Sequence, residues 1–158
     1  MEILCVIKLG LFEILIEKDM SWIFIASLKR FRMHDFIRDY GFVEYLQKNK
    51  VQEGDIVYLY ITAPYKRVEY KMIVERTDIS LREAFDDRAY SLLNEPTTLL
   101  ESDKVVRLKY VDRVQTDDLC YCKLREHGFN LTMQSNRKLN EETAEYIEGF
   151  FNSASTLL

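Results

Sequence analysis

The sequence at residues 51–65 is VQEGDIVYLYITAPY, and this stretch decides the fold class. Gly54-Asp55 is a typical turn pair, and the β-branched and aromatic residues after it are typical of a strand. Residues 68–76 have a similar composition, so the two segments are predicted to form a hairpin around Pro64-Tyr65. The two-residue period of a strand gives this hairpin one face for the core, formed by Val57, Leu59 and Ile61.

The segments around this hairpin indicate both strands and helices. Residues 22–27 are apolar on both faces, as in a covered strand, and residues 105–111 alternate like a third strand. Apolar side chains recur at helical spacing from Met33 to Tyr40, before Gly41, and a capped helix is predicted after Asn140. Asp117 could cap another helix that runs to Glu126. The pattern predicts an α+β fold, a small mixed β-barrel with flanking helices.

Composition bounds the class of protein. The chain has 158 residues, 30% of them charged and 47% hydrophobic, which is typical of one folded domain and not of a disordered or membrane-spanning chain. A net charge of −4 argues against binding that rests on phosphate attraction alone. The charge is uneven, however, because residues 21–76 hold 10 Lys and Arg against 7 Asp and Glu.

The first twenty residues form an apolar extension before a predicted single domain at 21–158. Glu2, Lys8 and Glu13 interrupt the extension, which is too short and too charged to span a bilayer and lacks the pattern of a signal peptide. Two interpretations stay open: an extra strand or helix packed on the domain, or a translation start at Met20. Three cysteines without a secretory signal predict reduced thiols and a cytoplasmic protein.

Three stretches of the chain resemble the EVE domain of the PUA-like superfamily, which is related to the YTH and ASCH domains. They are WIFI at 22–25, YLQ at 45–47, and GDIVYLY at 54–60 with Pro64 after it. The later QSNR at 134–137 resembles a Gln-Gly-Pro-x-Arg element of that family. The resemblance implies a PUA-like barrel that binds nucleic acid, and several members read a modified base flipped into an aromatic pocket.

The resemblance also implies where such a site would lie. The candidate base-binding pocket consists of Ser27, Tyr45, Gln47, Tyr60, Pro64 and Tyr65. The candidate contacts to phosphate and nucleic acid are Lys29, Arg30, Arg32, Lys66, Gln134 and Arg137. Two positions depart from the family pattern, since Tyr45 stands where the family usually has Trp, and Ser27-Leu28 where it often has Asn-Pro.

These residues predict a nucleic-acid-binding module that recognises a flipped, modified base, with DNA favoured over RNA. A nuclease or another effector would act in trans. The alternative is a structural or regulatory interaction protein whose pocket is vestigial and whose apolar N-terminus mediates self-association.

Two patterns that suggest catalysis or a metal are weak on geometric grounds. Asp55 followed by Glu69-Tyr70-Lys71 resembles a metal-nuclease motif, but the hairpin would hold the two carboxylates about 20 Å apart. Cys120 and Cys122 would point about 200° apart on a helix, so they cannot readily share one zinc ion with His127. The sequence therefore predicts no enzyme, no metal and no cofactor.

Overall fold

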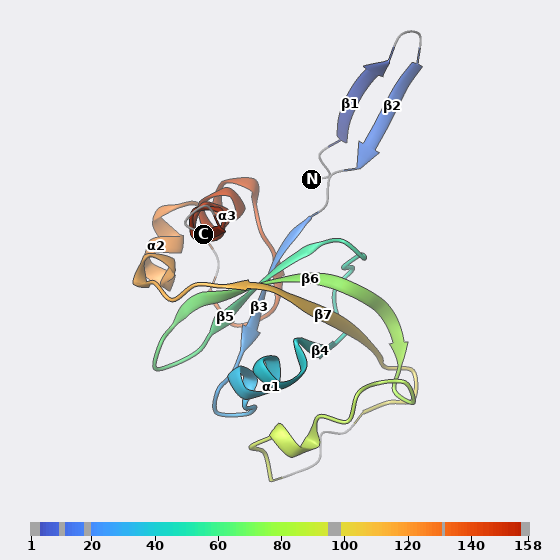
Figure 1. Ribbon diagram of the computed structural model, residues 1–158, viewed down its shortest axis with the longest axis vertical. Helices are drawn as coiled ribbons and strands as arrows, with labels where there is room; N and C mark the ends of the chain where they lie inside the picture. Colours follow the sequence, from blue (N-terminus) through green and yellow to red (C-terminus); the bar gives the residue numbers. More distant parts are fainter. Residues whose placement is uncertain (1–3, 10–11, 18–19, 95–98, 131, 156–158) are drawn as a thin grey trace.

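The computed structural model describes residues 4–9, 12–17, 20–94, 99–130 and 132–155. The chain forms a two-stranded sheet and a separate six-stranded sheet with the order β4-β7-β6-β5-β3-β8 (Figure 1). The strands are β1 (Leu4–Leu9), β2 (Phe12–Glu17), β3 (Ser21–Ala26), β4 (Phe42–Leu46), β5 (Ile56–Ile61), β6 (Arg67–Ser80), β7 (Lys104–Arg113) and β8 (Arg137–Lys138). The helices are α1 (Met33–Tyr40), α2 (Tyr121–Glu126) and α3 (Glu141–Ser155), with short 3₁₀ turns η1 (Arg88–Tyr90) and η2 (Asp117–Leu119).

The large sheet is mixed and open. Strand β3 runs parallel to β5, and the other strand pairs of this sheet are antiparallel. Within the described residues the end strands β4 and β8 do not pair with each other, so hydrogen bonds between strands do not close the sheet. The predicted α+β class is confirmed, and the predicted barrel is a loose one.

The face of β5 predicted for the core is confirmed. Val57, Leu59 and Ile61 are fully buried in one cluster, which also contains Phe36 and Ile37 of α1. That helix ends where the sequence predicts: Gly41 has a φ of 74°, and its N–H donates to the carbonyl of Ile37 at 2.8 Å. Glycine adopts this left-handed backbone without the steric cost that a side chain would bring.

The opposite face of β5 is buried as well, beneath α2 and α3. Tyr58 and Tyr60 pack there with Leu124 of α2 and Phe151 of α3. The predicted cap of α3 is present, because Asn140 Oδ1 accepts the N–H of Thr143 at 2.8 Å. The sheet is therefore covered on both faces. Successive residues of β5 contact the two cores in turn, because neighbouring side chains on a strand point to opposite faces.

The helix predicted from Asp117 to Glu126 is wrong in detail. The segment divides into η2 and α2, and Thr116 caps it in place of Asp117, with its Oγ1 accepting the N–H of Asp118 at 3.2 Å. None of the described helices is long and apolar enough to cross a membrane.

The turn role predicted for Asp55 is confirmed. Its buried carboxylate accepts the backbone N–H of Gln52 at 2.9 Å and the indole N–H of Trp22 at 3.0 Å, while its other oxygen accepts the N–H of Met20 at 3.1 Å. One carboxylate thus fastens the turn before β5 to the start of β3, which explains why the Trp22 strand and the Gly54-Asp55 turn occur together.

Candidate functional site

A cavity of about 700 Å³ lies at the open side of the large sheet. Its walls come from the end of β3, the segment before α1, strand β4, and two loops around residues 48–49 and 133–136. This volume falls within the range of about 300–1,000 Å³ that is usual for small-molecule sites. The cavity is thus large enough for one flat, ring-shaped ligand such as a nucleobase.

Side chains, and not strand pairing, hold the walls of the cavity together. Strand β8 pairs only with Trp22 and Ile23, so Ile25 has no strand partner on that side. Asn136 Oδ1 accepts the N–H of Ile25 at 2.8 Å, and the hydroxyl of Tyr45 donates to its carbonyl at 3.0 Å. We call these two hydrogen bonds the seam. The seam therefore links β3 to β4 through Tyr45, and to the loop before β8 through Asn136, at the place where strand pairing ends.

Tyr45 also forms part of the cavity wall. Its ring packs edge-on against Phe24 with the centroids 5.2 Å apart, and burial raises the pKa of its hydroxyl well above the ordinary value. The hydroxyl therefore stays protonated at neutral pH, and its one proton is the one donated to the Ile25 carbonyl. Phe31, Met33 and Val43 add apolar surface to the same cavity.

Two cations and two acids line the cavity, and they differ in how they are paired. Glu44 binds Arg107 at 2.7 Å and accepts the N–H of Phe85 at 2.7 Å. Arg30, Lys48 and Asp87 form no ion pair with any of the described residues. Burial, followed by the charges of Glu44 and Asp86, raises the pKa of Asp87. The cavity therefore holds two exposed cations and one carboxyl group that can interact with a ligand.

The structure brings together some of the residues predicted for the site. Ser27 and Tyr45 from the predicted pocket line the cavity, and so do Arg30 and Gln134 from the predicted nucleic-acid contacts. These four residues come from the end of β3, from β4, and from the loop before β8, so only the folded chain brings them to one place.

Tyr60 and Gln47 lie elsewhere, so the structure does not bring these two predicted pocket residues to this cavity. Tyr60 is 5% exposed and packs in the core beneath α2 and α3, on the sheet face opposite to Tyr45. Burial raises the pKa of Tyr60 to about 12. Gln47 binds Asp78 through its side chain, accepting the backbone N–H at 2.7 Å.

The loop after β5 contacts the cavity only through Thr62. Pro64, Tyr65 and Lys66 are exposed and do not line the cavity, and Arg67 lies over the ring of Tyr65 at 5.1 Å. The structure therefore does not bring Pro64 and Tyr65, which the sequence predicted for the pocket, to this cavity.

The other predicted phosphate contacts are spread around the cavity. Lys29 is exposed beside Arg30 but does not line the cavity. Arg32 is bound to Asp35 at 2.9 Å. Arg137 lies on β8 opposite Ile23, with its buried Nε lacking a hydrogen-bond partner among the described residues.

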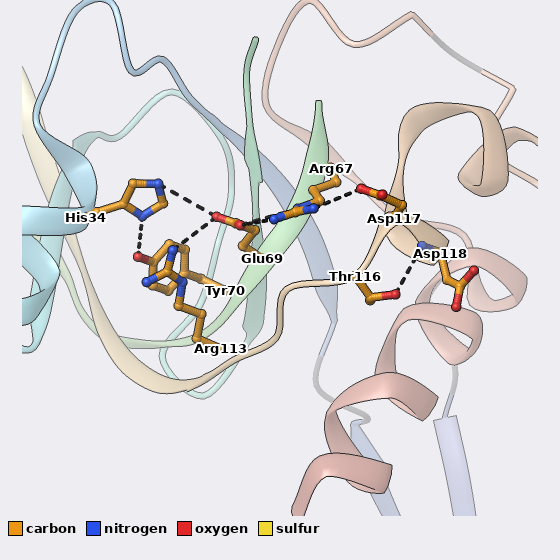
Figure 2. Close-up of polar contacts among 8 residues, drawn as sticks. All are labelled: His34, Arg67, Glu69, Tyr70, Arg113, Thr116, Asp117 and Asp118. Carbon is orange, nitrogen blue, oxygen red and sulfur yellow. Dashed lines mark hydrogen bonds and ion pairs between the residues drawn. The ribbon is translucent and has the colours of Figure 1, made fainter. Parts of the chain in front are cut away.

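A second group of polar side chains lies between α1 and η2, and Figure 2 shows its contacts. Glu69 is 1% exposed and contacts Arg67 at 3.0 Å and Arg113 at 3.5 Å. His34 lies 3.7 Å from the same carboxylate and 2.5 Å from the hydroxyl of Tyr70. We call these five residues the Glu69 cluster. A register shift between β5 and β6 at Leu59 and Tyr60 leaves Glu69 outside the pairing with β5, and its buried carboxylate is compensated by the two arginines.

Sequence reasoning did not identify several residues of the cavity. Asn136 lies in the QSNR stretch that resembles the family element, but the sequence predicted contacts only for Gln134 and Arg137 there and not the hydrogen bond from Ile25 to Asn136. Lys48, Asn49 and Asp87 had no sequence signal, because they belong to irregular segments whose position depends on the whole fold.

Comparison with solved structures places the chain among proteins of known fold. It superimposes on an ASCH protein from Zymomonas mobilis with a TM-score of 0.56 and 17% identity, covering 82% of this chain and 94% of that one. A hypothetical protein from Leishmania major gives a TM-score of 0.57 at 16% identity, covering 87% and 98%. Human THYN1, in complex with DNA containing 5-methylcytosine, gives 0.56 at 10% identity, covering 84% and 97%.

No protein-family model matches the chain, and no curated protein sequence does. At these identities the likeness defines the fold alone. The chain has the PUA-like fold of the ASCH and THYN1 structures, as the sequence predicted.

Proposed function

We propose that this protein is an EVE-type module that binds DNA and accepts a flipped, modified base in the cavity. The observation that carries the proposal is an open cavity of about 700 Å³ whose lining combines the rings of Phe31 and Tyr45 with two cations that have no ion partner among the described residues. The THYN1 structure supports it, because that protein has the same fold and is bound to DNA containing 5-methylcytosine.

The lining suits the chemistry of base recognition. Extruding a base costs a few kcal/mol, which contacts inside the pocket must offset. Phe31 and Tyr45 supply ring surface, while Ser27, Gln134 and Asn136 supply groups that can hydrogen-bond to a base edge. Arg30 and Lys48 are exposed at the cavity, where they can contact the phosphates that flank an extruded nucleotide.

The proposed activity is recognition without catalysis, in the cytoplasm. A nuclease or another effector acting in trans would then convert binding into a response. The rival proposal, a vestigial pocket in a structural protein, is less well supported because the cavity is open and is not filled by side chains.

The proposal is tested with the double variant Arg30→Gln/Lys48→Gln. A fluorescently labelled duplex with one 5-methylcytosine is titrated at several salt concentrations, and anisotropy gives the affinity. We expect the affinity to fall about tenfold or more, since a hydrogen bond to a charged group contributes about 1.5–3 kcal/mol. The slope of log K against log salt should become shallower by about 2, one unit for each phosphate that the variant no longer neutralises.

The matched control is Lys123→Gln/Arg125→Gln on α2, which changes the net charge equally but lies on the other side of the sheet from the cavity. Equal losses in both double variants would indicate attraction by net charge alone and would contradict a site at the cavity.

A further inference from the structure

The segment that follows β6, residues 81–94, brings an acid to a cavity formed mainly by other parts of the chain. Asp87 lines the cavity of about 700 Å³ and also a neighbouring one of about 450 Å³. Backbone hydrogen bonds fasten its surroundings to the segment before α1: Arg32 N–H donates to the Tyr90 carbonyl at 2.9 Å, and Leu92 N–H to the Arg30 carbonyl at 2.9 Å. These bonds, with the N–H of Tyr90 donating to the Asp87 carbonyl at 3.0 Å, hold the backbone around Asp87 beside the cavity.

Asp87 differs from the other acid of this cavity. Glu44 is already neutralised by Arg107, whereas the carboxylate of Asp87 has no ion pair among the described residues and accepts a hydrogen bond from its own backbone N–H. Arg30 and Lys48 line the same cavity without pairing with it. A half-buried carboxylate in such a place is an acceptor that a ligand can use.

We infer that Asp87 selects bases that carry an exocyclic amino group. This inference rests on the proposed function and adds the class of base to it. Aspartate commonly accepts a hydrogen bond from N4 of cytosine. A thymine in the same position would present its O4 to the carboxylate, so two acceptors would face each other and both would lose their hydrogen bonds to water. The apolar surface of Phe31, Met33 and Val43 in the same cavity suits a methyl group on the ring.

The test uses 5-methylcytosine and thymine, since the two bases differ only at position 4 and in the proton on N3. Each is placed at one position opposite an abasic site, so that neither must break a base pair. We expect the wild-type protein to prefer 5-methylcytosine by about tenfold or more, the discrimination that a hydrogen bond to a charged group supports. In Asp87→Asn the preference should fall to about onefold to threefold, because an amide can either accept from N4–H or donate to O4.

The neighbouring residue supplies the control. Asp86→Asn changes the net charge equally, but Asp86 is exposed, paired with Arg88 at 2.8 Å, and outside the larger cavity. It should keep the wild-type preference. Thermal unfolding of both variants checks that each is folded.

The outcomes separate this inference from the proposed function. If Asp87→Asn keeps the full preference while Arg30→Gln/Lys48→Gln weakens binding, the role of Asp87 is overturned and the proposal that DNA binds at the cavity is supported. If the wild-type protein binds neither oligonucleotide above background, both proposals are overturned. A wild-type protein that binds both bases equally also overturns the role of Asp87.

Discussion

The cavity and the Glu69 cluster both gather charged side chains from several elements, but their charges are paired differently. In the cluster the buried carboxylate of Glu69 contacts two arginines, and one of these, Arg67, also binds Asp117 at 2.8 Å (Figure 2). In the cavity, Arg30, Lys48 and Asp87 have no ion partner among the described residues. A buried charge needs its partners for the fold to be stable, whereas an unpaired group beside a cavity is free to bind a ligand.

The largest effect that we expect is on the cluster. Glu69→Gln removes the charge that neutralises Arg67 and Arg113, and breaking a buried ion pair costs about 3–5 kcal/mol. We expect a loss near the lower end, about 3 kcal/mol in the free energy of unfolding, because Arg67 keeps Asp117 and Arg113 is 33% exposed. Urea denaturation monitored by circular dichroism measures this loss.

The control for that variant is Glu75→Gln, an exposed carboxylate on the same strand. It should change stability by less than about 0.5 kcal/mol, as is usual for a surface substitution. If Glu69→Gln instead lowers the preference for 5-methylcytosine and leaves stability unchanged, the distinction between the two regions is wrong.

The sequence predicted the hairpin and its two faces correctly, because alternation along a strand is a local property. It did not predict which core each face meets. Tyr60 is buried beneath α2 and α3, which lie far beyond it in the chain, and Tyr45 reaches β3 only because β4 joins the sheet through β7. A pocket assembled from such distant segments cannot be read from spacing within one of them.

The individual acidic residues show the same difference between local and long-range contacts. Asp55 was assigned to its turn correctly, since its partner Gln52 is three residues away. Glu69 lies at a register shift in strand pairing with two arginines from β6 and β7 around it, and Asp87 reaches the cavity from an irregular segment. Alternation along one strand indicates neither the shift nor these partners, so only the folded chain shows what surrounds these two acids.

A smaller effect distinguishes the two tyrosines that the sequence placed together. Tyr45→Phe removes the donor to the Ile25 carbonyl, and we expect a loss of about 1 kcal/mol in the free energy of unfolding. Tyr60→Phe should cost less than about 0.5 kcal/mol, because the described residues offer its hydroxyl no hydrogen bond and its ring stays in the core. Amide hydrogen exchange at Ile25, whose N–H donates to Asn136 in the same seam, tests whether the loss of the Tyr45 bond loosens the other bond, with faster exchange expected in Tyr45→Phe alone. Equal losses in the two variants would mean that the hydroxyl of Tyr45 does not stabilise the seam.

The smallest effect concerns the pH dependence of the cluster. Burial, followed by the charge of Arg113, lowers the pKa of His34 below its ordinary value of 6.5. The native state therefore binds a proton less readily than the unfolded chain, and stability must fall as the pH drops below about 6.5 until it reaches the lowered pKa. Above that window His34 is neutral in both states and has no such effect.

Replacing His34 with glutamine should make stability less sensitive to acid. We expect the loss in the free energy of unfolding between pH 7.5 and pH 5.5 to be smaller in His34→Gln than in the wild-type protein. The difference should be less than about 1 kcal/mol, because a ring that is 28% exposed is partly screened by solvent. Denaturation at the two pH values in both proteins isolates the contribution of His34, since the other titrating groups are common to both. A wild-type protein that gained stability on acidification relative to His34→Gln would show that Glu69 attracts the proton more strongly than burial repels it.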